Sequence, residues 1–202
     1  MPSATDQERT LELARRAQGV TPSELANKGI HRQTLTRLVA QGRLERVARG
    51  VYRLPGEPIT ENHGLAIVAT AVPHGVICLL SALQYHDVGT QLPSEVWIAL
   101  DRRAWRPRLR YPPLRIVRFT GKSLSAGIEN HRLEGRPVKV YALAKTVADC
   151  FKYRNKIGLD VALEALRAGW RARRFTMDEL DRYAAICRVQ RVMRPYIEAL
   201  TA

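Results

Sequence analysis

Residues 21–56, TPSELANKGIHRQTLTRLVAQGRLERVARGVYRLPG, constrain the fold of this chain more than any other part of the sequence. Thr21 is followed at once by Pro22 and, three residues after the threonine, by Glu24. This is a capping box with proline at the first helical position, and it predicts the start of a short helix that ends near Gly29. An earlier helix is predicted from the leucines and alanines of residues 11–17.

A further helix is predicted from about residue 31 to 41, closed by Gly42. Leu35, Leu38 and Val39 stand at i, i+3 and i+4, so we expect them to face inward. A short helix, a tight turn and a second helix with a polar, basic outer face form the layout that places a recognition helix in the major groove of DNA. The residues expected to contact DNA from this helix are His31, Arg32, Gln33, Thr34, Thr36 and Arg37.

A β-hairpin is predicted directly after this helix. Leu44, Val47, Val51 and Tyr52 indicate two short strands, with residues 48–50 as the turn between them. A hairpin that follows a helix-turn-helix makes a wing, from which side chains reach phosphates or the minor groove. The wing residues expected to contact DNA are Arg43, Arg46, Arg49 and Arg53. The alternative interpretation is a small basic helical bundle whose arginines are only solvated.

The charge balance favours a polyanionic partner. The chain has 33 Lys+Arg and 19 Asp+Glu, a net charge of +14. Residues 1–56 contribute ten basic and five acidic side chains (+5), and the remainder contributes +9. Nucleic acid is the usual partner of such a protein, and an anionic membrane surface is the rival. No apolar run approaches the ~18 residues of a spanning helix, and MPSATDQERT lacks the apolar core of a signal peptide, so we expect a cytoplasmic protein without a membrane partner.

The sequence shows no catalytic or metal-binding constellation. Its histidines include no i, i+4 pair, and GxSxG, GxGxxG and P-loop motifs are absent. Cys78, Cys150 and Cys187 are far apart and odd in number, which fits buried thiols in a reducing cytoplasm. We therefore expect no enzyme, no metal and no cofactor. A nucleic-acid-processing enzyme with an unrecognised site stays the alternative.

Two titratable residues in the second half have a structural interpretation. His86 stands beside Asp87, but sequence neighbours on a helix point in different directions, so we expect His86 to bond to the backbone of its own domain. Asp149 lies on a helical pattern with a buried face and needs a basic partner there, such as Lys145 or Lys152.

The segment LPGEPITEN is typical of a linker and predicts two domains, residues 1–56 and 57–202. Beyond it, residues 65–88 are mostly apolar and predicted helical, with a break at residues 73–75. The runs EVWIAL, LRIVRF, IENHRLEG and RPVKVYAL indicate strands, and the pattern from residue 142 is helical, with a capping box from Thr176 to Glu179. The predicted fold class is α+β: an N-terminal winged helix-turn-helix, then an α+β domain with a small sheet and several helices.

Residues 102–118 carry seven arginines and no acidic residue, interleaved with Trp105, Tyr111 and prolines. A charge run on a loop is usually a solvated face, whereas arginine beside aromatic rings is typical of a nucleic-acid surface. The two interpretations stay open. The secondary nucleic-acid surface, if present, would use Arg102, Arg103, Arg106, Arg108 and Arg110.

The stretches LERVARGVYRL, SALQYHDVGTQLPSEVWIAL and VYALAKTVADCFKYRNKIGLDVALEAL together resemble AbiEi-type antitoxins, the regulatory members of type IV toxin–antitoxin systems. The resemblance extends from about residue 8 to 195 and rests on arrangement, since none of these stretches is a catalytic signature. It implies a winged helix that binds inverted repeats in its own operator and represses transcription. It also implies a C-terminal domain that counteracts a nucleotidyltransferase toxin without a stable complex. A winged-helix regulator whose second domain senses a small ligand is the alternative.

Overall fold

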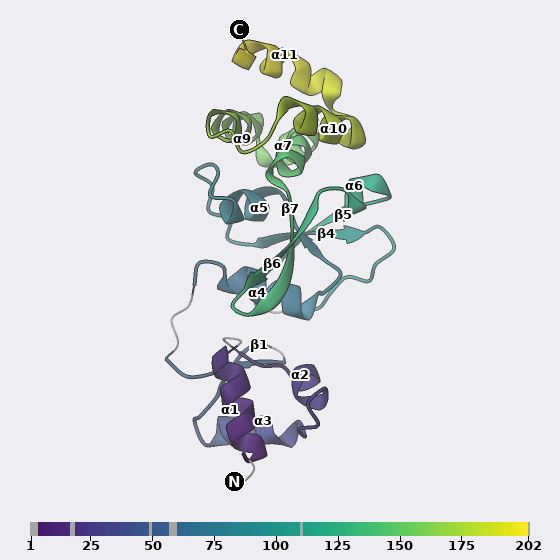
Figure 1. Ribbon diagram of the computed structural model, residues 1–202. Coiled ribbons are helices and arrows are strands. Elements are labelled where there is room, and N and C mark those ends of the chain that lie inside the picture. Colours follow the sequence, from purple (N-terminus) through teal and green to yellow (C-terminus); the bar gives the residue numbers. More distant parts are fainter. Residues whose placement is uncertain (1–3, 17–18, 49, 57–59, 110, 202) are drawn as a thin grey trace. The chain divides into compact units, whose positions relative to one another are not determined.

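The computed structural model describes residues 4–16, 19–48, 50–56, 60–109 and 111–201 (Figure 1). Helices and two sheets give the chain the α+β class that the sequence predicts. The chain divides into two compact units. The first contains Met1–Pro73, Pro107–Pro112 and Arg132–Val138, and the second contains His74–Arg106, Pro113–His131 and Lys139–Ala202. The boundary between residues 56 and 57 stays a prediction.

The N-terminal part of the first unit has the predicted order of three helices and a hairpin. These elements are α1 (Asp6–Arg16), α2 (Pro22–Ala26), α3 (Gln33–Ala40), β1 (Glu45–Ala48) and β2 (Val51–Arg53). The two strands are antiparallel. A bridge from Val20 attaches them to the segment before α2, since Val20 N donates to Tyr52 O at 2.6 Å and Tyr52 N donates to Val20 O at 3.0 Å. This arrangement is that of a winged helix-turn-helix.

A small apolar core holds these elements together. Its buried members are Ala14, Val20, Leu25, Ile30, Leu35, Leu38 and Leu44. They come from α1, α2, α3 and the connections between them, so each helix turns its apolar stripe toward the others. The predicted inward positions Leu35 and Leu38 are confirmed, at 1% and 0% exposure, and Val39 is partly buried.

The rest of the chain contains the second sheet and the remaining helices. In chain order they are α4 (His63–Ala71), β3 (Val76–Ile77), α5 (Leu79–Tyr85), β4 (Val96–Asp101), β5 (Leu114–Phe119), α6 (Lys122–Ser125), β6 (Ile128–Leu133), β7 (Arg136–Tyr141), α7 (Leu143–Lys152), α8 (Arg154–Ile157), α9 (Leu159–Arg171), α10 (Met177–Cys187) and α11 (Gln190–Thr201). The four predicted strands and the helical C-terminal region are confirmed. No described helix combines the length and the hydropathy that crossing a membrane requires.

The second sheet has the strand order β5-β4-β3-β7-β6. β4 runs parallel to β5 in the register Val96↔Leu114, β3 is antiparallel to β4, and Ile77 of β3 pairs in parallel with Val140 of β7. One expectation is corrected here. Residues 65–88 do not form two helices separated only by the break. The strand β3 follows the break and occupies the centre of the sheet. A two-residue strand is too short to produce an alternating pattern, so only its burial marks it.

Helix α7 is the centre of the second unit. It packs against α5, α9 and α10, and Figure 1 shows it entering directly from β7 with α11 beyond α10. All its residues from Leu143 to Phe151 are buried, including Lys145 and Asp149. A helix that is buried on every side needs partners for any charge it carries.

Candidate nucleic-acid interface

The turn between α2 and α3 sets the orientation of the predicted recognition helix. The capping box is present, with Thr21 Oγ1 accepting from Glu24 N at 3.3 Å and Glu24 Oε2 accepting from Thr21 N at 2.7 Å. Gly29 has a φ of 71°, a conformation that favours glycine, and it ends the turn before Ile30, which is 2% exposed. His31 Nδ1 then accepts a hydrogen bond from Gln33 N at 3.2 Å at the start of α3.

The outer face of α3 is polar and basic, as the periodicity predicts. The described side chains on it that are exposed are His31, Arg32, Gln33, Thr36 and Arg37. Thr34 is different, because its residue is only 9% exposed. It stands four residues before Leu38, so it belongs to the buried stripe of the helix. Thr34 therefore does not share the exposed face with the other predicted contact residues.

A shallow hollow beside α3 is lined by an acidic residue as well as by basic ones, so this face is not uniformly positive. It has a volume of about 500 Å³ and is lined by Thr5, Asp6, Gln7, His31, Gln33, Thr34 and Arg37. Asp6 brings a carboxylate next to the basic residues, and Arg9 Nη1 lies 3.2 Å from its Oδ1. The basic character of the face is thus strongest away from Asp6.

The wing arginines are not equivalent. Arg43 and Arg46 are exposed. The side chain of Arg53 is 12% exposed and forms an ion pair with Glu45, Nε to Oε1 at 2.5 Å. Glu45 and Arg53 are direct cross-strand partners in the hairpin, which explains the pair. Arg53 is therefore engaged within the wing, and Arg49, at its predicted tip, lies outside the described residues.

The arginines of residues 102–118 are also divided. Between β4 and β5, Arg102, Arg103, Arg106 and Arg108 are exposed, and Arg110 lies outside the described residues; Arg115 and Arg118, on β5, are exposed as well. Arg118 donates from Nη1 to Asp101 O and to Ala104 O, both at 2.7 Å, and Arg115 forms an ion pair with Glu95 at 2.8 Å. Two of the seven arginines in this segment thus serve the fold itself, and Trp105 beside the others is 94% exposed.

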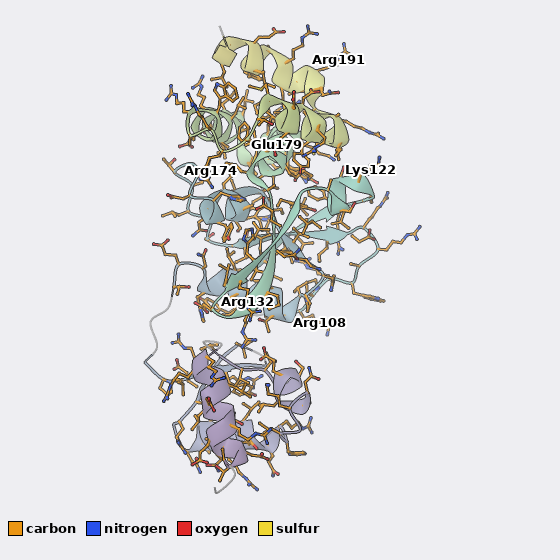
Figure 2. All side chains as sticks on the ribbon, viewed as in Figure 1. Arg108, Lys122, Arg132, Arg174, Glu179 and Arg191 are labelled. Carbon is orange, nitrogen blue, oxygen red and sulfur yellow. The ribbon has the colours of Figure 1, made fainter. Side chains whose placement is uncertain are left out.

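Other basic side chains lie outside the predicted recognition helix and wing and outside residues 102–118, and no sequence motif marks them. Figure 2 shows nitrogen-bearing side chains on both units, not only on the N-terminal segment. Lys122, Lys152, Arg154 and Arg188 line one cleft in the second unit. They are separated by up to 66 positions in the sequence (188 − 122) and follow no local pattern, so only the fold brings them together.

His86 and Asp149 have the structural roles that the sequence predicts. His86 Nε2 lies 2.8 Å from Tyr141 O, and burial lowers the pKa of this imidazole. Asp149 Oδ2 accepts from Lys145 Nζ at 2.5 Å, and its Oδ1 accepts from Cys187 Sγ at 3.1 Å. Burial raises the pKa of Asp149, and the Lys145 ammonium opposes that rise.

The described residues contain no group of His, Cys, Asp and Glu side chains arranged to hold a metal ion. The cysteines are buried, and burial raises the pKa of each thiol, that of Cys187 to about 12. Thiols with such pKa values stay protonated at neutral pH and are poor nucleophiles.

A comparison with protein families agrees with this interface. Residues 8–55 match the family described as "Transcriptional regulator, AbiEi antitoxin". The matched segment contains α1, α2, α3 and the wing, and no curated protein matches the chain. The matched description is that of a regulator and antitoxin, which fits the exposed basic face of a winged helix. Residues 8–55 of this chain are therefore similar to a family of transcriptional regulators, the AbiEi antitoxins.

Proposed function

We propose that this protein is a DNA-binding antitoxin that represses its own operon and neutralises a nucleotidyltransferase toxin encoded beside it. The observation that carries the DNA-binding part is an exposed row made of Arg32, which caps α3, and of Gln33, Thr36 and Arg37 on that helix. The row lies inside the segment that matches the regulator family. Arginine pairs with guanine and glutamine with adenine in the major groove. A repressor acts where the DNA is, so the proposal assigns the protein to the cytoplasm.

The wing supports this row with contacts that do not read sequence. Arg43, just before β1, and Arg46, on β1, are exposed, whereas Arg53 forms an ion pair with Glu45. We assign Arg43 and Arg46 to phosphate or minor-groove contacts and Arg53 to the stability of the hairpin. His31, at the start of α3, is assigned to the same interface. Thr34 is left out because it is buried.

The exposed arginines between β4 and β5 are assigned a smaller role. Arg102, Arg103 and Arg106 have no acidic partner among the described residues, so they can add contacts to phosphate that are independent of sequence. Reversing the charge at Arg103 and Arg106 should lower operator affinity and its salt dependence, and leave sequence preference unchanged. Loss of toxin neutralisation with normal DNA binding would assign these arginines to the antitoxin function instead.

Two observations support the toxin-neutralising part of the proposal. Residues 8–55 match a family described as antitoxins, and the sequence beyond them resembles AbiEi-type antitoxins. The proposed mode needs no stable complex between the two proteins. The test has two arms. Binding of the full chain to labelled DNA from upstream of its own gene is measured by fluorescence anisotropy against random DNA of equal length. Growth is measured in cells that express the neighbouring nucleotidyltransferase gene, with and without this protein.

Selective binding to the upstream DNA together with restored growth supports the proposal. Equal affinity for the two DNAs would contradict the proposal that the protein recognises an operator upstream of its own gene. A neighbouring region without a nucleotidyltransferase gene contradicts the toxin assignment. The variants Arg32→Ala and Arg37→Ala should impair DNA binding and leave growth rescue intact if the two activities lie in different parts of the chain.

A further inference from the structure

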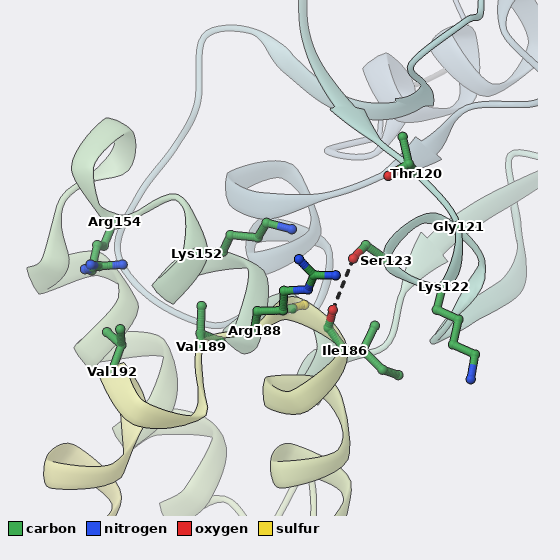
Figure 3. Close-up of a pocket in the computed structure, with 11 residues that line it drawn as sticks. Thr120, Gly121, Lys122, Ser123, Lys152, Arg154, Ile186, Arg188, Val189 and Val192 are labelled. Atoms are coloured by element: carbon green, nitrogen blue, oxygen red, sulfur yellow. Dashed lines mark hydrogen bonds between the residues drawn. The ribbon is translucent and has the colours of Figure 1, made fainter.

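The second unit contains an open cleft of about 900 Å³ (Figure 3). Three segments line it: the turn that follows β5, the junction of α7 and α8, and the junction of α10 and α11. The lining residues are Thr120, Gly121, Lys122, Ser123, Lys152, Arg154, Ile186, Cys187, Arg188, Val189 and Val192. All of them belong to the second unit, so this cleft is separate from the interface on α3.

The cleft is strongly basic. Lys122, Lys152, Arg154 and Arg188 are among its lining residues, and none of the lining residues is acidic. Among the described residues, Lys122, Lys152 and Arg188 are exposed and have no carboxylate within ion-pair distance. In Figure 3 the Lys152 and Arg188 side chains extend toward one another. Two cations that extend toward one another repel, and an anion bound between them would offset that repulsion.

The walls that carry these charges are ordered by specific contacts. Ser123 Oγ donates to Ile186 O at 3.2 Å, which ties the start of α6 to the end of α10 (Figure 3). Arg188 closes α10 in a left-handed conformation, with φ 60° and ψ 43°. Arg154 Nη1 donates to Phe151 O at 2.9 Å at the end of α7. The backbone positions of the basic residues are therefore set before any ligand arrives.

One side of the cleft is apolar. Ile186, Val189 and Val192 line it from the α10 end and from α11. Cys187 adds a buried thiol there, and its Sγ donates to Asp149 Oδ1 at 3.1 Å. Burial raises the pKa of this thiol to about 12, so Cys187 lines the cleft without being reactive. The volume lies within the range of roughly 300–1,000 Å³ for small-molecule sites.

We propose that this cleft binds a small organic phosphate of nucleotide size, with its phosphates among Lys122, Lys152 and Arg188 and its ring or hydrocarbon part against Val189 and Val192. The basic side chains account for the phosphates, and the apolar wall accounts for the remainder of the ligand. No bond is made or broken in this site. The function is binding, and it goes beyond the DNA-binding and antitoxin activities proposed above.

The test uses the full chain and a fluorescent ADP, whose anisotropy is titrated at low salt. Saturable binding is expected. Unlabelled pyrophosphate should compete less well than ADP because it lacks the apolar part, and adenosine should compete least because it lacks phosphate. Lys122→Ala and Arg188→Asn should each weaken binding about tenfold or more, the size expected for a lost charge-assisted hydrogen bond. Asparagine is chosen because it tolerates the left-handed backbone at that position.

The matched control is Arg191→Gln, which removes an exposed cation near the start of α11 that does not line the cleft. Circular dichroism confirms that each variant is folded. An equal loss in Arg191→Gln and Arg188→Asn would overturn the proposal, because it would mean attraction to net charge alone. No saturable ADP binding overturns it as well. Stronger competition by a single-stranded oligonucleotide than by ADP would assign the cleft to a nucleic-acid chain and not to a small ligand.

Discussion

Helices α3 and α7 carry basic residues in opposite settings. In α3 the described basic side chain, Arg37, is exposed, and the buried residues are Thr34, Leu35 and Leu38. In α7 the residues from Leu143 to Phe151 are all buried, and Lys145 and Asp149 are each 0% exposed. The charge of Arg37 is thus open to solvent, whereas that of Lys145 is neutralised inside the protein; the last residue of α7, Lys152, is exposed.

The environment of the α7 pair explains how a buried ammonium is accommodated. Lys145 Nζ contacts Asp149 Oδ2 at 2.5 Å, and it lies 4.2 Å from the centroid of the Tyr141 ring and 4.9 Å from that of Phe119. The ring faces add a cation–π attraction. The buried pair contributes no net charge, so the +9 of residues 57–202 comes from the other charged side chains of that region. A count of charges does not show where on the surface they are concentrated.

The largest effect is expected from breaking the buried pair. Asp149→Ala leaves Lys145 as an uncompensated buried charge, which should lower the free energy of unfolding by about 3–5 kcal/mol. Chemical denaturation of the full chain measures it. The control is the double variant Lys145→Met/Asp149→Leu, which should be less destabilised than the single variant. A single variant as stable as the parent protein would contradict the ion pair.

The counterpart in the first unit is Arg37→Ala on α3. Here we expect little change in stability because the side chain is exposed, and a loss of about 1–3 kcal/mol in operator binding if Arg37 pairs with a guanine. Lys28→Ala, which removes an exposed cation from the turn between α2 and α3, is the matched control. Equal losses on operator and random DNA would make Arg37 a phosphate contact and not a reader of sequence.

Local patterns predicted much of this fold. Both capping boxes, the hairpin, the inward leucines of α3 and the Lys145 partner of Asp149 follow from spacings of one to four residues. Thr34 is the exception, because it is among the residues expected to contact DNA although its spacing to Leu38 puts it on the buried stripe of α3.

Features set by tertiary packing could not be predicted in this way. The engagement of Arg53 depends on the hairpin register that places Glu45 opposite it. The strand β3 has only two residues, and its identity comes from its neighbours β4 and β7. The basic cleft combines segments that are far apart in the sequence, so no spacing rule applies to it.

A smaller effect comes from the two matched capping boxes. Thr21 Oγ1 accepts from Glu24 N at 3.3 Å in the first unit, and Thr176 Oγ1 accepts from Glu179 N at 3.2 Å in the second. Each threonine-to-alanine change should cost about 1 kcal/mol of stability. Only Thr21→Ala should also weaken operator binding, because α2 orients α3. Weaker DNA binding in Thr176→Ala would show that the two regions are coupled.

The smallest effect is expected in the wing, and it appears in salt dependence more than in affinity. Arg46→Ala removes an exposed cation from β1, and the slope of log K against log salt should fall by about one unit if Arg46 contacts a phosphate. The control is Glu45→Ala/Arg53→Ala, which removes a paired acid and base and leaves the net charge unchanged. Its slope should equal that of the parent protein, because Arg53 is held by Glu45.

An unchanged slope in Arg46→Ala would mean that this strand does not contact DNA, and the recognition helix would then carry the interface alone. A fall in the slope of the double variant would mean that Arg53 leaves Glu45 for a phosphate when DNA binds, and the contrast between the partly buried Arg53 and the exposed Arg46 would not survive binding.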